Sequence, residues 1–296
     1  MTIANAQCLN YTIIKNESQK ALYRIIMSEE KNRPNYANPP VQEIGIGFSF
    51  DNSRIKTDFD KIVNVFHTNN RIEFPVIEQQ GFLIPIDISS ETSKADESKD
   101  ESKNEIVMRQ ERDRYVLSNV SHRRVIVIKD SYFSFRVLRN EEGNFPKYSV
   151  VYPEALKFFE SFSGEYSTLK ELQLVYRDEI EIPIGESFDA NDYFRIGVNL
   201  PEALDNTIQN LDLSLKLDIP ADQLLDSSLE IAFSCIKPQK EGNLRFRFVW
   251  LLDSNLAKSL PSPTKESIIQ HLDAMHEQIY RYFDASFTDQ CKSSFK

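Results

Sequence analysis

The sequence has 296 residues, of which 41% are hydrophobic and 27% charged, the usage of an ordinary globular protein. Its formal net charge of −10 disfavours nucleic acid and anionic membranes as partners, because like charges repel. No apolar run approaches the length of a membrane span, and the first residues lack the pattern of a signal peptide. The cysteines form no C-x-x-C pair, which predicts reduced thiols and a cytoplasmic location without membrane association.

The chain begins with an irregular segment, for which we predict an N-terminal arm over residues 1–38. We assign residues 39–296 to a single domain. Within it, Ser89 to Asn104 carries no aromatic and no large aliphatic side chain, so nothing there offsets the entropy cost of ordering. Strand patterns resume on both sides of this segment. We therefore interpret residues 89–104 as a disordered insertion within the domain.

Strands account for most of the regular pattern. In Val41 to Phe50, large apolar residues alternate with Gly45, Gly47 and Ser49, the period of a half-buried strand. The segment Leu211 to Ile219 alternates strictly between apolar and polar residues, which indicates an antiparallel sheet with one solvated face. The other predicted strands cover residues 82–88, 115–120, 124–129, 132–138, 169–182, 229–236 and 244–252.

Three helices complete the predicted domain. One follows Asp51 and carries apolar residues up to Phe66, and a short central helix runs from Pro153 to Gly164. The longest helix opens with Pro263.

The longest helix carries a one-sided apolar stripe from Ile268 to Phe287, and we expect Gln270 and Glu277 on its tolerant, solvated side. Such a helix buries its apolar stripe most readily against the apolar face of a sheet. The predicted fold is therefore α+β, a curved antiparallel sheet backed by a long C-terminal helix and a shorter central helix.

Four motifs occur in an order that resembles a known family. They are Pro39 to Glu43 (PPVQE), the Tyr152-Pro153 step, the strand Tyr176 to Pro183 (YRDEIEIP), and the helix Leu272 to Asp289 with its spaced His, Phe and Phe-Thr-Asp. The family is a sporadically distributed group of bacterial proteins of unassigned function. The resemblance covers most of the chain and leaves the N-terminal arm and the insertion as additions.

The resemblance implies an α+β body but no site residues, because the family has no established activity. The family strand usually carries an asparagine where Asp178 or Glu179 stands in this sequence. The patchy occurrence of the family is typical of mobile defence or immunity gene clusters. The resemblance therefore implies an accessory role beside a toxin or effector.

Signatures of catalysis are missing from the sequence. There is no glycine-flanked serine elbow and no phosphate-binding glycine loop, and the pair Gly45 and Gly47 lies in a strand, where it favours close packing. His271 and His276 are five residues apart on a helix and point in different directions, so they cannot share a metal ion. We expect no catalytic residues, no metal and no cofactor, and the balance favours a non-enzyme.

One carboxylate cluster is a candidate site. Asp178, Glu179 and Glu181 lie near the end of one strand, and alternation places Glu179 and Glu181 on one face and Asp178 on the other. Paired carboxylates suit acid–base chemistry or cation binding. The alternative is a solvated sheet edge in an acidic protein.

Arginines form the second candidate site. Arg114, Arg123 and Arg124 fall within a short stretch with two further arginines, and Arg245 and Arg247 share one face of a late strand. Such residues suit a surface for an anionic ligand or RNA. The alternative is that they pair with carboxylates on neighbouring strands.

The sequence thus favours a non-catalytic interaction protein. Its expected partner is another protein, in keeping with the accessory role that the resemblance implies, and a homodimer is left open. One alternative is a small-ligand sensor with a pocket between the sheet and the C-terminal helix. A weaker alternative is a hydrolase or nuclease that uses the carboxylates from Asp178 to Glu181.

Overall fold

The computed structural model describes residues 39–51, 59–87, 106–139, 145–163, 166–183, 190–195, 212–236, 243–256, 260 and 263–295. The predicted arm and the predicted insertion lie outside these residues. By their internal contacts, the described residues from 40 to 183 and from 212 to 279 form a large unit. The described residues 39, 190–195 and 280–295 belong to a small unit. The prediction of one domain over residues 39–296 stays a prediction.

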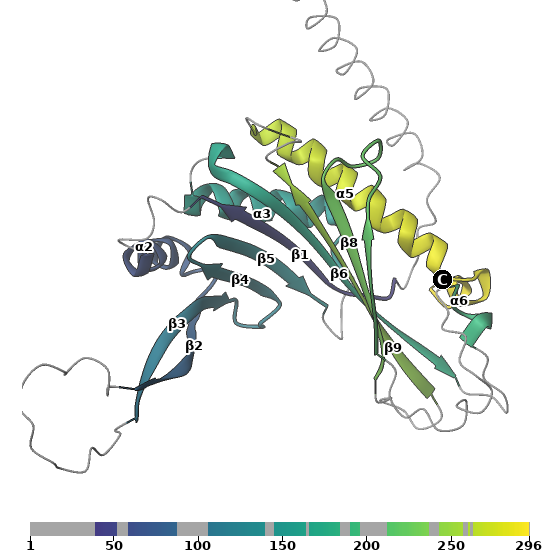
Figure 1. Ribbon diagram of the computed structural model, residues 1–296, viewed down its shortest axis with the longest axis horizontal. Helices are drawn as coiled ribbons and strands as arrows, with labels where there is room; N and C mark the ends of the chain where they lie inside the picture. Colours follow the sequence, from purple (N-terminus) through teal and green to yellow (C-terminus); the bar gives the residue numbers. More distant parts are fainter. Residues whose placement is uncertain are drawn as a thin grey trace, which may run out of the picture. The chain divides into compact units, whose positions relative to one another are not determined.

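The large unit is built on a nine-stranded sheet in the order β2-β3-β4-β5-β1-β6-β9-β8-β7, in which every neighbouring pair is antiparallel (Figure 1). β1 takes a central place between β5 and β6, while β2 and β7 form the two edges. The strands are β1 (Val41–Phe50), β2 (Val76–Asp87), β3 (Ile106–Ser118), β4 (Arg124–Lys129), β5 (Tyr132–Leu138), β6 (Leu169–Pro183), β7 (Asp212–Asp218), β8 (Ser227–Ile236) and β9 (Asn243–Asn255).

The predicted α+β fold with an antiparallel sheet and a C-terminal helix is confirmed. The longer helices of the described residues are α2 (Phe59–Asn70), α3 (Tyr148–Ser163) and α5 (Lys265–Ser286). The predicted start of the central helix is wrong, because α3 begins at Tyr148 and Pro153 lies inside it. Pro153 is only the sixth residue of α3, so its missing N–H removes one early helical hydrogen bond.

Helices cover one face of the sheet, which we call the covered face. Phe48 of β1 stacks on Phe159 of α3 with ring centroids 4.4 Å apart. Tyr176 of β6 meets His276 of α5, with its hydroxyl 2.9 Å from Nδ1. Phe66 of α2 packs edge-on against Phe133 of β5. The core therefore lies between these helices and the alternate strand residues that face them.

The part of α5 in the large unit buries more than its apolar stripe. Ile268, Leu272 and Met275 are fully buried, as the stripe predicts. Glu277 is also buried, with only 3% of its surface exposed. The expectation that Glu277 lies on the solvated side of the helix is therefore wrong, whereas Gln270 is exposed. The spacing of apolar residues along the sequence thus predicted a narrower buried surface than α5 has in the structure.

The small unit has its own aromatic cluster. Phe287 forms a backbone bridge with Phe194 and packs edge-on against that ring and against Phe295. Thr288 then caps the short helix α6 (Asp289–Ser293) by accepting a hydrogen bond from the N–H of Cys291 at 3.2 Å. These contacts hold the C-terminal residues of the chain in place within this unit.

Candidate functional site

Polar side chains gather on the face of the sheet opposite the covered face, which we call the open face. In β6, Leu174, Tyr176 and Asp178 are buried, whereas the residues between them are only half-buried. The same alternation runs through β9, where Phe248 is buried and Arg247 is not. Because neighbouring strands keep this alternation in register, their polar side chains meet on the open face.

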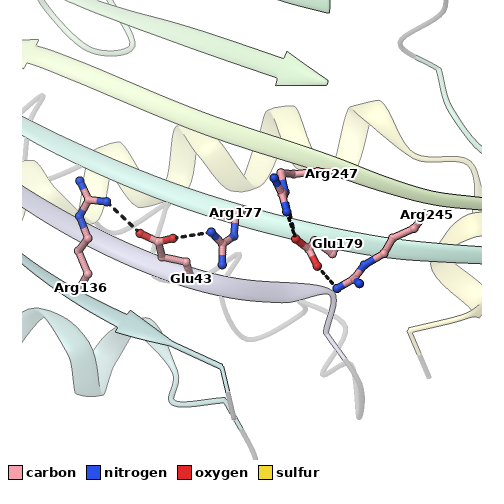
Figure 2. A network of polar contacts seen from close by, with 6 residues as sticks. All are labelled: Glu43, Arg136, Arg177, Glu179, Arg245 and Arg247. Carbon is pink, nitrogen blue, oxygen red and sulfur yellow. Dashed lines mark hydrogen bonds and ion pairs between the residues drawn. The ribbon is translucent and has the colours of Figure 1, made fainter. Parts of the chain in front are cut away.

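A first ion-pair group on the open face joins three strands. Glu43 of β1 lies between Arg136 of β5 and Arg177 of β6, with N···O distances of 3.4 and 3.2 Å (Figure 2). Only 9% of the Glu43 side chain is exposed, compared with 40% for Arg136 and 31% for Arg177. The carboxylate is thus covered by two guanidinium groups that themselves reach solvent.

A second group repeats this arrangement on β6 and β9. Glu179 accepts hydrogen bonds from Nε and Nη2 of Arg247 at 3.0 and 2.9 Å, and a further one from Arg245. Its side chain is 7% exposed, so this carboxylate too is nearly buried beneath its partners. Figure 2 shows the two Arg–Glu–Arg groups, which we call the triads, following one another across the sheet. Arg245 and Arg247 therefore pair with a carboxylate on the neighbouring strand, one of the two predicted alternatives.

Each triad carries two positive charges and one negative charge, a net of +1. This contrasts with the whole chain, whose net charge is −10. Within the described residues, Nε of Arg177 is buried and has no hydrogen-bond partner. A buried donor without an acceptor is costly, and its cost is relieved when a ligand or water supplies the acceptor.

The open face also contains a hollow of about 560 Å³. Arg114, Lys129 and Arg136 supply its positive charges, one from each of β3, β4 and β5. The remaining side chains around this hollow are Gln80, Val116, Val127, Tyr132 and Gln173.

Hydrogen bonds fix two of the polar groups in the hollow. Nε of Arg114 donates to Oε1 of Gln80 at 2.8 Å. The hydroxyl of Tyr132 donates to Oε1 of Gln173 at 2.8 Å, and Nε2 of Gln173 donates to Asp253 at 2.9 Å. Burial raises the pKa of Tyr132 above its usual value, an effect that nearby Arg136 opposes. Tyr132 is thus an uncharged hydrogen-bonding wall of the hollow.

A glycine makes this position of Tyr132 possible. A Cβ atom on Gly47 would lie 2.6 Å from the hydroxyl oxygen of Tyr132, which is closer than real contacts allow. The Tyr132 ring therefore crosses β1 over Gly47 to reach Gln173 on β6. Gly45 is less constrained, because its Cβ would meet Arg136 Cγ at 3.4 Å. The sequence predicted close packing at Gly45 and Gly47, and the contact between Gly47 and Tyr132 is such close packing.

The predicted carboxylate cluster is divided between the two faces. Asp178 is 1% exposed and lies on the covered face, where one oxygen accepts a hydrogen bond of 2.7 Å from Nε1 of Trp250. Its other oxygen has no partner among the described residues. Burial raises the pKa of Asp178 to about 7, and the bond from Trp250 opposes the rise. Glu179 and Glu181 lie on the open face, as predicted.

The two predicted arginines at the β3–β4 turn lie away from the triads. Arg124 points to α3 and forms an ion pair of 2.8 Å with Glu154. The backbone N–H groups of Arg123 and Arg124 both donate to the side chain of Asn119, which shapes the turn. Both arginines therefore lie at the β3–β4 turn, and Arg124 reaches α3 through Glu154.

His271 and His276 of α5 make polar contacts with different strands, β9 and β6. Nε2 of His271 lies 2.6 Å from the hydroxyl of Ser254, and burial lowers the His271 pKa to about 4. His276 contacts Tyr176 and also stacks on Tyr148 with ring centroids 4.2 Å apart. Among the described residues, no group of three or more His, Cys, Asp or Glu side chains is arranged to hold a metal ion.

Three members of the triads were missing from the sequence-based candidates: Glu43, Arg136 and Arg177. Arg136 lies between Phe135 and Val137, the pattern of an outward-facing strand position, whereas Glu43 follows Gln42 and Arg177 precedes Asp178. Such local patterns do not reveal the mutual contacts of the three residues. Their meeting depends on β1 lying between β5 and β6, which strand order along the chain does not indicate.

Comparisons with protein families, with curated proteins and with solved structures found no match to this chain. The resemblance to a bacterial family therefore stays a prediction. None of the helices in the described part of the chain combines the length and the apolar character needed to cross a membrane.

Proposed function

We propose that this protein is a non-catalytic binding protein that holds an acidic partner protein on the open face of its sheet. The observation that carries the proposal is the pair of triads. Glu43 and Glu179 are nearly buried, and the side chains of the four arginines around them are 19% to 41% exposed. This is an ordered cationic strip on an acidic chain.

The choice of arginine supports an interface. A guanidinium group presents several N–H donors in a rigid plane, so it still has donors for a partner after pairing with a glutamate. Arginine is also enriched at protein interfaces and among the residues that dominate their affinity. The buried glutamates hold the arginines in position before binding, which reduces the entropy lost when a partner arrives.

Electrostatics favours an acidic partner surface. The two triads together supply a net charge of +2, which Glu181 beside Arg245 on the same face lowers to +1. Complementary charge speeds association and selects among partners. The surrounding negative charge of the chain repels partners that lack a matching pattern. From the family resemblance we add that the product of a neighbouring gene, such as a toxin or effector, is the first partner to test.

The arrangement of residues on the sheet supports partner binding over the two alternatives, a carboxylate-dependent hydrolase or nuclease and a small-ligand sensor with its pocket beneath α5. Asp178 lies on the opposite face from Glu179, so these carboxylates do not share a site for hydrolysis. Leu272 and Met275 of α5 are fully buried. The hollow lined by Tyr132 opens instead on the open face.

A photo-crosslinking experiment tests this proposal. A benzoylphenylalanine at Val249, which is paired with Arg177 in the sheet, samples the strip between the triads. The matched control carries the same group at Val65 of α2, which is 54% exposed. In lysate of the source organism, we expect a specific adduct from position 249 and none from position 65.

The dependence of the adduct on the arginine charges tests whether the triads bind the partner. The double substitution Arg177→Gln and Arg247→Gln should remove the adduct at position 249, and Arg71→Gln on an exposed residue should not. Melting curves of all variants check that the fold is retained. An adduct that forms equally at both positions, or survives the double substitution, would refute the proposed interface.

A further inference from the structure

We infer that the hollow on the open face is a binding site for a small organic molecule that carries a phosphate group. The hollow measures about 560 Å³ and lies over β2 to β6. This volume falls within the range of about 300–1,000 Å³ typical of small-molecule sites. The inference goes beyond the proposed function, because Arg114 and Lys129 belong to neither triad.

The charge of the hollow calls for an anion. Three consecutive strands each contribute one cation to it, namely Arg114, Lys129 and Arg136. Among the described residues that line the hollow, none is a carboxylate. Like charges on one face of adjacent strands disfavour the folded state. Glu43 offsets part of that repulsion from outside the hollow, because it pairs with Arg136 at 3.4 Å. A bound phosphate group would offset more of it.

The hydrogen-bonding groups of the hollow are mainly donors. Arg114 uses its Nε on Gln80, which leaves its terminal nitrogens for other acceptors. Since Oε1 of Gln80 is taken, its amide NH₂ remains as a donor. Arginine and lysine side chains have no acceptor at all. A ligand with acceptors only, such as a phosphate monoester, matches this set better than an alcohol or an amine.

The size and the walls of the hollow call for more than a bare phosphate. Val116 and Val127 supply apolar surface, and the ring of Tyr132 forms a flat wall. The Tyr132 hydroxyl is held by Gln173, so the ring is fixed in place before any ligand binds. An inorganic ion would leave most of this volume and all of this apolar surface unused. The matching ligand therefore has a compact organic body attached to its phosphate.

Calorimetric titration of the full chain tests this inference. The probes are adenosine monophosphate and ribose 5-phosphate, with adenosine, ribose and inorganic phosphate as controls. We expect at least one of the two phosphorylated probes to bind more tightly than its unphosphorylated form and than inorganic phosphate. Arg114→Gln and Lys129→Gln should each weaken that binding about tenfold or more, the usual effect of losing a charged hydrogen bond. The control Arg71→Gln should leave the affinity unchanged.

Specific outcomes would overturn the inference. They are no binding of either phosphorylated probe at millimolar concentration, equal affinities in wild type and Lys129→Gln, or inorganic phosphate binding as tightly as the organic phosphates. A phosphoserine peptide that binds more tightly than both probes would also overturn it, since the phosphate would then belong to a partner chain.

The crosslinking experiment keeps this inference separate from the proposed function. Arg114→Gln and Lys129→Gln leave both triads intact, so the adduct at position 249 should persist in these variants. Conversely, Arg177→Gln with Arg247→Gln should leave the binding of organic phosphates within about twofold of wild type, a difference of under about 0.5 kcal/mol.

Discussion

Asp178 and Glu179 are neighbours on β6 with the same kind of side-chain group, yet the two faces of the sheet treat them differently. Asp178 enters the core on the covered face, where it has one hydrogen bond, from Trp250, and a pKa raised to about 7. Glu179 lies on the open face beneath Arg245 and Arg247. The apolar core thus favours the neutral form of its acid, whereas the open face pairs its acid with cations.

The difference shows in which environment a carboxylate can contribute to binding a partner. A buried carboxyl without a cationic partner tends to take up a proton, so it offers a partner little charge. A carboxylate between two arginines orders those arginines and leaves the group as a whole positive. Asp178 therefore influences the pH dependence of stability, whereas Glu179 influences the charge and order of the binding surface.

The largest expected effect lies on the covered face and concerns pH. The pKa of Asp178 is raised on folding, so the folded state binds more protons between about pH 4 and pH 7, and this acid's contribution to stability falls as pH rises. His271 has a lowered pKa, so its contribution rises from about pH 4 to pH 6.5. In the wild type the two trends oppose each other.

Single substitutions separate the trends. Relative to Asp178→Asn, the wild type should lose up to about 1.4 kcal/mol of unfolding free energy per pH unit between about pH 4 and pH 7. Relative to His271→Gln, it should gain stability with pH, by less because part of that ring reaches solvent. Urea unfolding at several pH values measures both. Parallel curves for wild type and Asp178→Asn would contradict a raised pKa for Asp178.

A smaller effect is expected on the open face. Glu179→Gln removes the charge between Arg245 and Arg247 and should lower the unfolding free energy by about 1–2 kcal/mol, since a nearly buried ionic hydrogen-bond group is broken. The control Glu181→Gln, on the same face of β6 but half-exposed, should change it by less than about 0.5 kcal/mol. Urea midpoints in low and high salt measure both variants. Equal losses would show that burial beneath arginines confers nothing special on Glu179.

The sequence predicted the elements of the fold well, because alternation along a strand and the stripe of a helix are local properties. The alternation of β6 alone was enough to place Asp178 and Glu179 on opposite faces. The central place of β1 was out of reach, since it depends on pairing with β5 and β6, which are far along the chain. The triads share that dependence, because they join residues as far apart in the chain as Glu43 and Arg177.

The candidate site was only partly predictable for the same reason. Arg245 and Arg247 were recognisable as a pair on one strand face, and their carboxylate partner was among the expected alternatives. Arg124 was misleading, because a run of arginines in sequence does not show which face each residue takes. In the structure it reaches Glu154 of α3. The hollow depends on several strands at once, and no local pattern indicates it.

The smallest expected effect concerns two glycines on β1 and distinguishes packing from strand propensity. Replacing glycine by alanine in a strand usually stabilises by about 0.4–1 kcal/mol, because the unfolded chain loses freedom. At Gly45 the new methyl group would meet Arg136 at an ordinary 3.4 Å, so Gly45→Ala should be neutral or slightly stabilising. At Gly47 it would collide with the Tyr132 hydroxyl, so Gly47→Ala should cost about 1 kcal/mol net as Tyr132 leaves Gln173. Urea midpoints compare the two variants, and equal stabilities would mean that Tyr132 does not lie over β1. Only Gly47→Ala should also weaken organic phosphate binding, since the wall of the hollow moves with Tyr132.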